Sequence, residues 1–197
     1  MRSIIESNIV SFNKVTESKP RVVVKIGSSL LANDEHLTPR YAFIHGLLSD
    51  IATLKSDGYE VILTSSGSVA LGMNAISSTI EKASITDKQA AAACGQPILM
   101  NAYKQVALEY GFDIAQVLVT LEDLEDMQRF LNTKNTVGRL LERGVMPIVN
   151  ENDTVTTEEL RVGDNDRLAA KIAQMVHAEH LIILTCIDGL YDRNPDE

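Results

Sequence analysis

Residues 21–29 read RVVVKIGSS and join a run of β-branched residues to a glycine and two serines. The run follows Pro20 and stops at Gly27, so it predicts a buried strand that ends in a tight turn. Short apolar runs bounded by turn residues predict further strands at 60–64, 113–120, 145–149 and 180–185. Apolar residues spaced three or four apart predict helices between them, at 38–57, 69–80, 87–110, 121–143 and 164–178.

This alternation of strands and helices predicts an α/β fold, in which a mostly parallel sheet is sandwiched between helices. The crossover connections are expected to be right-handed. Pro97 is expected to start or kink a helix within 87–110. The Thr-rich stretch 151–160 is expected to form a loop or one small hairpin. We expect residues 20–197 to be one domain and residues 1–19 to be a loosely attached N-terminal extension.

The composition is that of an ordinary globular protein, with 45% apolar and 23% charged residues among 197. A formal charge of −9 without a Lys/Arg block disfavours nucleic acid and anionic membranes as partners. No apolar run approaches the length of about 20 residues that spans a bilayer. Two cysteines, Cys94 and Cys186, give no disulfide framework, so we expect reduced thiols and a cytoplasmic protein.

Polar residues gather at the carboxyl end of each predicted strand, except the strand at 113–120. In doubly wound sheets, ligands bind at this edge. Folding alone does not readily explain several polar clusters at one edge, and a further cluster precedes the last helix. The clusters lie at 25–29, 64–67, 150–153, 163–166 and 185–189.

Lys25 stands inside a β-branched run, where burying an ammonium group costs desolvation energy. One interpretation is a lysine at the end of a strand that extends its charge to solvent. The functional interpretation is a fixed positive charge beside a phosphate, with Gly27 allowing backbone N–H groups to approach it. Phosphoryl transfer depends on such positioning and on stabilising charge on the equatorial oxygens.

The other clusters each have a structural and a functional interpretation. The Ser66-Gly67 turn is either an ordinary helix cap or a cradle for a carboxylate or phosphate. The stretch 150–153, NEND, is either a turn or a set of groups for an ammonium and a carboxylate. The stretch 164–166, DND, caps a helix, but it also has an acid that can orient a lysine or hold Mg²⁺. His177 and His180 lack an evident third ligand, so no protein-held metal is predicted.

The chain has neither a GxxxxGK[ST] loop nor a GxGxxG fingerprint, which excludes a P-loop kinase and disfavours the usual dinucleotide fold. Instead it resembles the glutamate 5-kinases of the amino acid kinase superfamily. The resemblance runs from about 21 to 195, and the NEND and VGDND pair is its most specific part. The matching segments are 24–29 (VKIGSS), 63–72 (LTSSGSVALG), 93–96 (ACGQ), 129–132 (RFLN), 149–153 (VNEND) and 162–168 (VGDNDRL).

The resemblance implies ATP-dependent phosphorylation of the γ-carboxylate of L-glutamate, with Mg²⁺, as the first step of proline synthesis. It also implies feedback inhibition by proline and a homo-oligomer, either a dimer or a tetramer. It assigns phosphoryl contact to Lys25 and orientation of that lysine to Asp166. It assigns glutamate binding to Ser66, Asn150, Asp153 and Asn165, and nucleotide binding to Lys25, Gly27, Ser28, Gly67, Thr185 and Cys186.

Two features depart from the family pattern. Cys186 stands where many relatives have Asp, and 197 residues stop before the later glycine-rich segment with its second lysine. The nucleotide-binding part is therefore expected to be incomplete, and the PUA domain of some members is not included. Two alternatives remain open. One is another kinase of the superfamily, acting on acetylglutamate, aspartate, carbamate or a nucleoside monophosphate. The other is a non-catalytic fragment that binds glutamate or proline.

Overall fold

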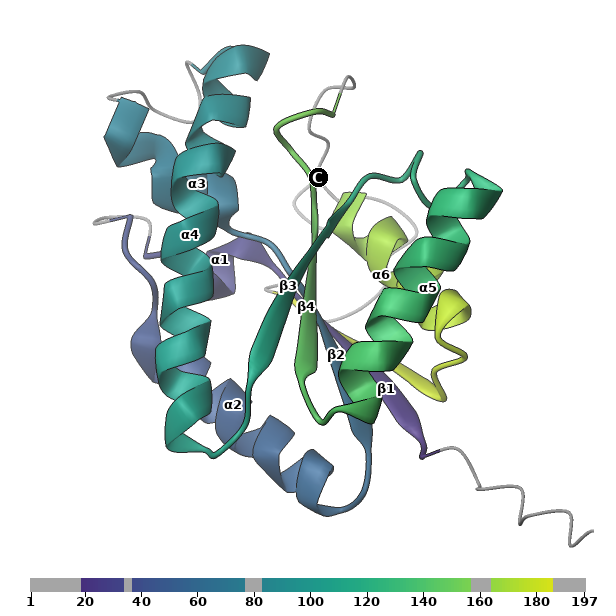
Figure 1. Ribbon diagram of the computed structural model, residues 1–197. Coiled ribbons are helices and arrows are strands. Elements are labelled where there is room, and N and C mark those ends of the chain that lie inside the picture. The colour runs from purple at the N-terminus through teal and green to yellow at the C-terminus, as the bar shows by residue number, and fades with distance from the viewer. Residues whose placement is uncertain (1–18, 34–36, 77–82, 157–163, 186–197) are drawn as a thin grey trace, which may run out of the picture.

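A sheet of five parallel strands forms the centre of the described residues, in the order β3-β4-β2-β1-β5 (Figure 1). The computed structural model describes residues 19–33, 37–76, 83–156 and 164–185. Strands β1 and β2 pair in register from Arg21 opposite Glu60 to Ile26 opposite Ser65. Because the other neighbouring strands also pair in parallel, the carboxyl ends of all five strands lie at the same edge. The strands are β1 Arg21–Ile26, β2 Glu60–Ser65, β3 Ile114–Val119, β4 Met146–Glu151 and β5 His180–Leu184.

The strand order determines which face of the sheet each helix covers. The chain moves in one direction from β1 to β2 to β3 and in the opposite direction from β3 to β4 to β5. Right-handed crossovers then require the helices after β1 and β2 to cover one face and those after β3 and β4 to cover the other. Figure 1 shows this arrangement, which gives an α/β/α sandwich. The first face has α1 Ser28–Leu31, α2 Tyr41–Ser56, α3 Ser68–Gly72 and α4 Ile85–Glu109; the second has α5 Met127–Glu142 and α6 Asp164–Met175.

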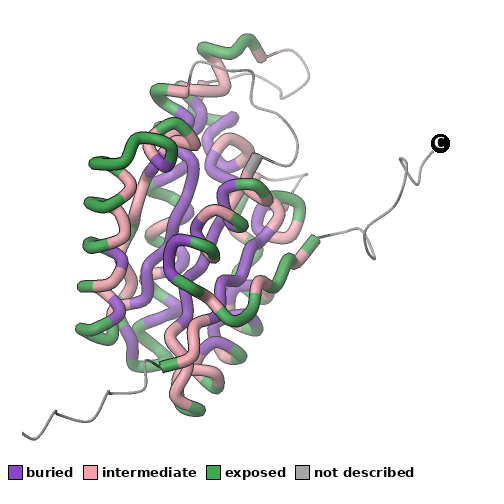
Figure 2. The backbone as a smooth tube through the Cα atoms, turned by 90° about the vertical axis from the view of Figure 1, so that its right-hand side faces the viewer, coloured by how far each residue is buried: buried purple, intermediate pink, exposed green. Residues whose placement is uncertain are grey.

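Each face of the sheet has its own apolar core. Val22 and Val24 of β1 pack with α2 and α4, whereas Val23 packs with α5 and α6, as the alternation of side chains along a strand requires. Figure 2 shows the buried strands between helices whose outer faces are exposed. The expectation of a mostly parallel, helix-covered sheet is confirmed. No described helix is both long and apolar enough to cross a bilayer.

Three expected helices differ from the observed ones. The helix expected at 121–143 begins only at Met127, because Asp126 caps it and residues 121–126 form turns. The helix expected at 69–80 begins at Ser68 as α3 and continues as a 3₁₀ helix, Met73–Ile76, beyond which residues 77–82 lie outside the description. The helix expected at 87–110 begins at Ile85 and contains Pro97 in its interior.

Pro97 was expected either to start a helix or to kink one. It does not start one, because α4 runs continuously through it. A proline removes the hydrogen bond to the carbonyl four residues earlier. Here that carbonyl belongs to Ala93, and both Ala93 and Pro97 are exposed. Water therefore has access to the carbonyl, which offsets part of the cost of the lost bond.

Strand β4 extends two residues further than expected and includes Asn150 and Glu151. The small hairpin expected at 151–160 is not present in its described part, where a turn follows the strand and the Val155 N–H donates to the Asn152 carbonyl at 3.1 Å. Residues 157–160 lie outside the description, as do residues 1–18 of the expected N-terminal extension.

Candidate functional site

A crevice is expected at the carboxyl edge between β2 and β4, because the chain leaves these neighbouring strands toward opposite faces of the sheet. Strand β2 leads into α3 on one face, and β4 leads toward α6 on the other. The segments that flank this point are Ser65–Ser68 and Asn150–Asp153, which contain several of the polar residues predicted from the sequence. Topology alone therefore places the two polar clusters beside each other.

Lys25 is buried near the end of β1 and pairs with Asp166 of α6. Its position alternates with Val24 and Ile26, so its side chain lies on the face of the sheet that α6 covers. The Lys25 Nζ lies 2.6 Å from the Asp166 Oδ1, and the exposed fractions of the two side chains are 9% and 43%. The Lys25 stem is thus enclosed, while the aspartate that pairs with it remains open to solvent. This excludes the interpretation of Lys25 as a side chain extended freely into water.

Three of the four predicted substrate-binding residues form a hydrogen-bonded cluster. The Asn165 Nδ2 of α6 donates to the Ser66 Oγ at 2.7 Å and to the Asn150 Oδ1 at 3.3 Å. Asn150 is almost completely buried at the end of β4. The cluster joins α6, the turn after β2 and the end of β4, so residues from three separate segments meet at one edge.

The fourth residue, Asp153, is buried after β4 and accepts a hydrogen bond from the Ser68 Oγ at 3.1 Å. The Asn150 Nδ2 approaches the same Ser68 Oγ at 3.5 Å, which links Asp153 to the cluster. A hollow of about 280 Å³ lies beside this contact and is lined by Ser68, Gln96, Gln116 and Asp153, among others. Asp153 therefore borders a space that a small molecule can enter.

The turn after β2 depends on a glycine at Gly67, whose φ of 99° is in the left-handed region that favours this residue. Beneath the turn, the Ser65 Oγ lies 3.0 Å from the Tyr103 hydroxyl of α4, and both side chains are buried. Burial raises the pKa of Tyr103 well above its usual value. Tyr103 therefore stays neutral and supports the turn that contains Ser66.

The turn after β1 places Gly27 and Ser28, two of the predicted nucleotide-binding residues, at the same edge of the sheet. The Gly27 N–H donates to the Leu184 carbonyl at 3.0 Å, so this N–H serves the sheet and not a ligand. The N–H groups of Ser28 and Ser29, in the first turn of α1, precede any possible intrahelical acceptor. Thr185 is exposed directly after β5, and Cys186 lies outside the described residues.

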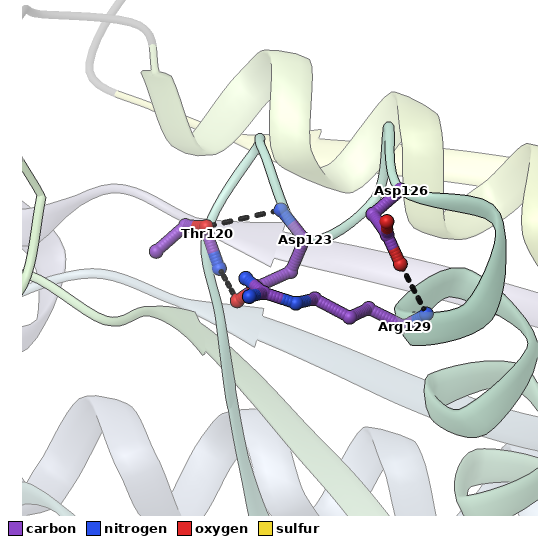
Figure 3. Close-up of polar contacts among 4 residues, drawn as sticks. All are labelled: Thr120, Asp123, Asp126 and Arg129. Atoms are coloured by element: carbon purple, nitrogen blue, oxygen red, sulfur yellow. Dashed lines mark hydrogen bonds and ion pairs between the residues drawn. The ribbon is translucent and has the colours of Figure 1, made fainter.

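A tightly bonded turn follows β3 at this edge (Figure 3). The Thr120 N–H donates to the Asp123 Oδ2 at 2.8 Å, and the Asp123 N–H donates to the Thr120 Oγ1 at 3.1 Å. The Arg129 Nη1 lies 2.7 Å from the Asp123 Oδ1, and Asp126 caps α5 through the Arg129 N–H. The backbone bond from Thr120, aided by Arg129, lowers the pKa of Asp123. Asp123 thus closes the turn, and Asp126 begins the helix that follows it.

Ser68 and Gln96 stand in the matching segments 63–72 and 93–96, but neither they nor Gln116 were predicted as site residues. Gln96 is buried on α4 and accepts a hydrogen bond from the Asn150 Nδ2 at 3.0 Å, while its Nε2 donates to the Gln116 Oε1 at 3.3 Å. The available signal was a glutamine directly after Gly95 in an alanine-rich helix. Polarity at a position that helical spacing assigns to the core indicates a buried partner.

The close approach of α3 and α4 places Ser68 and Gln96 beside the site. A Cβ atom added at Gly95 would lie 1.8 Å from the Ser68 carbonyl oxygen, and one added at Gly72 would lie 1.8 Å from the Ala91 carbonyl oxygen. Both positions therefore need glycine for packing. This crossing brings the first turn of α3 against the middle of α4.

Taken together, the described residues offer a buried cation, two hydroxyls, three amides and a buried carboxylate at one edge of a parallel sheet. Such an α/β/α arrangement defines a class of proteins that bind small charged molecules at the carboxyl ends of their strands. The chain belongs to the amino acid kinase family, whose sequence pattern matches residues 20–197.

Among relatives, the chain is similar to several glutamate 5-kinases. It is 49% identical to that of Dinoroseobacter shibae over 174 residues, which cover 88% of this chain and 47% of the relative. It is 47% identical to glutamate 5-kinase 2 of Bacillus subtilis over 178 residues, which cover 90% and 48% of the two chains. The chain thus spans about half the length of these relatives.

Solved structures of low sequence identity share the fold. UMP kinase from Ureaplasma parvum superposes with a TM-score of 0.61 at 17% identity, covering 88% of this chain and 73% of the other. Giardia carbamate kinase superposes with a TM-score of 0.60 at 15% identity, covering 91% and 78%. At such identities the likeness concerns the fold alone.

Proposed function

We propose that the protein to which this chain belongs transfers the γ-phosphoryl group of ATP to the γ-carboxylate of L-glutamate. The names of the relatives support this substrate, at 47–49% identity over about nine-tenths of this chain. The observation that carries the proposal is the enclosed Lys25–Asp166 pair, at the same sheet edge as the Ser66, Asn150 and Asn165 cluster. The γ-glutamyl phosphate so formed would serve proline synthesis.

In this proposal, Lys25 supplies the positive charge beside the transferring phosphoryl group. Loose phosphoryl-transfer transition states spread charge over three oxygens, so a pre-positioned cation stabilises them. Asp166 holds the Lys25 ammonium in place and thereby restricts its rotamers. Glutamate is assigned to Ser66, Asn150, Asp153 and Asn165, because these side chains provide donors and acceptors for an ammonium and a carboxylate.

For the nucleotide, we propose Ser28 and Ser29 as the backbone donors after β1, since the Gly27 N–H is already bonded within the sheet. Gly27 and Gly67 would allow close approach, and Thr185 and Cys186 would border the nucleotide. Among the described residues, no group of three acidic, His or Cys side chains could hold a metal. Mg²⁺ retains several waters and binds through substrate phosphates. We therefore assign it to ATP and not to a protein cage.

The assay is the formation of glutamyl hydroxamate from ATP, L-glutamate and hydroxylamine in the full-length protein. A glutamate-dependent product supports the proposal, and a product formed only with acetylglutamate, aspartate, carbamate or a nucleoside monophosphate assigns another substrate. Calorimetry separates a kinase from a non-catalytic sensor, because a kinase binds both the amino acid and Mg-ATP. Proline in the same titrations tests feedback inhibition.

Lys25 is the residue whose removal tests the proposed phosphoryl transfer most directly. Replacing it by alanine removes the positioned charge, so we expect turnover to fall by roughly 10²–10³. The matched control is Lys134→Ala, because Lys134 lies on α5 beside Arg21, at the start of β1 and therefore at the opposite edge of the sheet. Lys134→Ala should retain nearly full turnover. Equal rates for Lys25→Ala and the unsubstituted protein would remove the role assigned to Lys25.

The remaining proposals rest on the family resemblance and the composition. We assign residues 20–197 to the amino acid kinase part and residues 1–19 to an extension. We also propose a cytoplasmic homo-oligomer, either a dimer or a tetramer, without nucleic acid or membrane partners. Sedimentation of the purified protein tests the oligomer, and a mass that corresponds to one chain would contradict it.

A further inference from the structure

Four side-chain amides form a continuous hydrogen-bonded chain beneath the candidate site. The Asn165 Nδ2 donates to the Asn150 Oδ1 at 3.3 Å, and the Asn150 Nδ2 donates to the Gln96 Oε1 at 3.0 Å. The Gln96 Nε2 then donates to the Gln116 Oε1 at 3.3 Å. The chain crosses from α6 through β4 and α4 to β3, and its middle members, Asn150 and Gln96, are buried.

A single backbone group sets the direction of this chain. The Glu151 N–H donates to the Asn150 Oδ1 at 2.9 Å, and a backbone N–H can only donate. The Asn150 oxygen must therefore face Glu151, which directs the Asn150 Nδ2 toward the Gln96 oxygen. Asn165, which also contacts the Asn150 oxygen, must in turn present its own NH₂ group there.

This direction leaves two complementary groups for a ligand. The Asn165 Oδ1 is buried and has no hydrogen-bond partner among the described residues. The Ser66 Oγ accepts from the Asn165 Nδ2 at 2.7 Å, so its hydroxyl hydrogen remains able to donate elsewhere. An acceptor and a donor thus stand side by side, and the buried carboxylate of Asp153 is linked to them through Ser68 and Asn150.

We propose that Gln96 is a positioning residue. It accepts from the Asn150 Nδ2 while the Glu151 N–H donates to the Asn150 Oδ1, so the two together hold the Asn150 amide and Asn165 presents its oxygen to a primary ammonium group. The inference rests on the proposed function and adds to it the residue that selects an amino acid with a free amine. An N-acylated or amine-free ligand lacks the positive charge and most of the donors that this oxygen needs. A buried acceptor that stays unpaired carries the full cost of its desolvation, so such ligands are disfavoured.

Gln96→Met tests the proposal, because methionine has a similar length but no strong acceptor for the Asn150 Nδ2. Calorimetry measures the affinities for L-glutamate and for glutarate, which is the same dicarboxylate without the amine. In the unsubstituted protein we expect a preference for glutamate of roughly tenfold or more, as for hydrogen bonds to charged groups. In Gln96→Met the preference should fall severalfold, because the Glu151 N–H alone then holds the Asn150 amide, while the affinity for glutarate stays constant.

Two further variants complete the design. Gln96→Glu keeps an acceptor for Asn150 and should restore most of the preference for glutamate. Gln105→Met alters a glutamine on the exposed face of the same helix and should leave the preference unchanged. Should Gln96→Met not fold, Gln116→Met removes the last acceptor of the chain and should lower the preference by a smaller factor.

The outcomes separate this inference from the proposed function. Equal losses of glutamate and glutarate affinity in Gln96→Met would mean that Gln96 only supports the packing, which overturns the inference alone. An unchanged preference in that variant overturns it as well. If the unsubstituted protein binds no glutamate, the proposed function fails and the inference falls with it.

Discussion

The Tyr103 hydroxyl lies under the turn after β2, and its bond to the Ser65 Oγ joins two fully buried side chains near the site. Tyr103→Phe should lower the free energy of unfolding by about 0.5–1.5 kcal/mol, the usual net value of a hydrogen bond. The loss stays in this range because the Ser65 hydroxyl also donates to the Ser66 carbonyl at 3.1 Å. Urea unfolding monitored by circular dichroism measures the change.

The control for that prediction is Tyr41→Phe. Tyr41 is exposed on α2, and its hydroxyl lies 3.5 Å from the Gln105 Oε1, which is at the limit of a hydrogen bond. Its removal should change the free energy of unfolding by less than about 0.5 kcal/mol. If Tyr103→Phe and Tyr41→Phe lower the free energy of unfolding equally, the bond between Tyr103 and Ser65 contributes no more to stability than a surface hydroxyl does.

At this scale, the sequence predicted residues whose chemistry is unusual for their position. Lys25 in an apolar strand and Asn165 in an acidic helix start both indicated a site, and the structure brings their clusters to one edge. Gln96 was not predicted, because the helical pattern shows only that it faces inward. Its partner Asn150 lies 54 residues away in the sequence, and only the fold brings the two amides together.

The crossing of α3 and α4 depends on Gly95, and a matched pair of glycines tests this. Gly95→Ala would place a Cβ 1.8 Å from the Ser68 carbonyl oxygen, so the two helices must move apart. We therefore expect the free energy of unfolding to fall by about 1–3 kcal/mol. Gly138→Ala in α5 meets no atom within 4 Å, so the better helix propensity of alanine should stabilise by about 0.5–1 kcal/mol.

If close packing dominates at Gly95, thermal or urea unfolding should show a lower free energy of unfolding for Gly95→Ala than for the unsubstituted protein, and a higher one for Gly138→Ala. The displacement of Ser68 should also weaken the binding of the proposed ligand, L-glutamate, in Gly95→Ala but not in Gly138→Ala. A stabilised Gly95→Ala variant would contradict the close crossing of the two helices.

The turn after β3 predicts a dependence of stability on pH. The lowered pKa of Asp123 means that its carboxylate stabilises the folded state above the unfolded pKa of about 3.9. This contribution is lost as the pH falls through the lowered, folded-state pKa. Asp123→Ala should therefore be less stable than the unsubstituted protein at pH 7, by about 1 kcal/mol or less. The difference in the free energy of unfolding between Asp123→Ala and the unsubstituted protein should become smaller below about pH 4.

Urea titrations at pH 7 and pH 3.5 measure that difference, with Asp50→Ala on the exposed surface of α2 as the control. A difference that is constant with pH would show that the charge of Asp123 does not matter. The same turn explains why the helix boundary at 121 was wrong. Helical spacing of apolar residues continues through 121–126, but the paired bonds of Thr120 and Asp123 offer the backbone an alternative to the helix.

Across the whole molecule, the sequence predicted the layers better than the order of the strands. Continuous apolar strands separated by helices are sufficient to indicate a helix-covered parallel sheet. The order β3-β4-β2-β1-β5 was not accessible, because strand pairing depends on contacts distant in sequence. That order places β2 beside β4, and with it Ser66 beside Asn150. The polar clusters that meet at this edge could therefore be predicted, whereas their geometry required the fold.

The site joins both layers of helices, because the turn after β2 leads to α3 on one face and Asn165 belongs to α6 on the other. A ligand bound between them should stabilise the whole fold. At 100 times its dissociation constant, the proposed ligand L-glutamate should add about 2.7 kcal/mol by mass action. For a chain of this size this raises Tm by roughly 5–10 °C. Asn165→Ala should abolish most of the rise, while glutarate should give a smaller rise in the unsubstituted protein. An equal rise in Asn165→Ala would mean that glutamate binds elsewhere on the molecule.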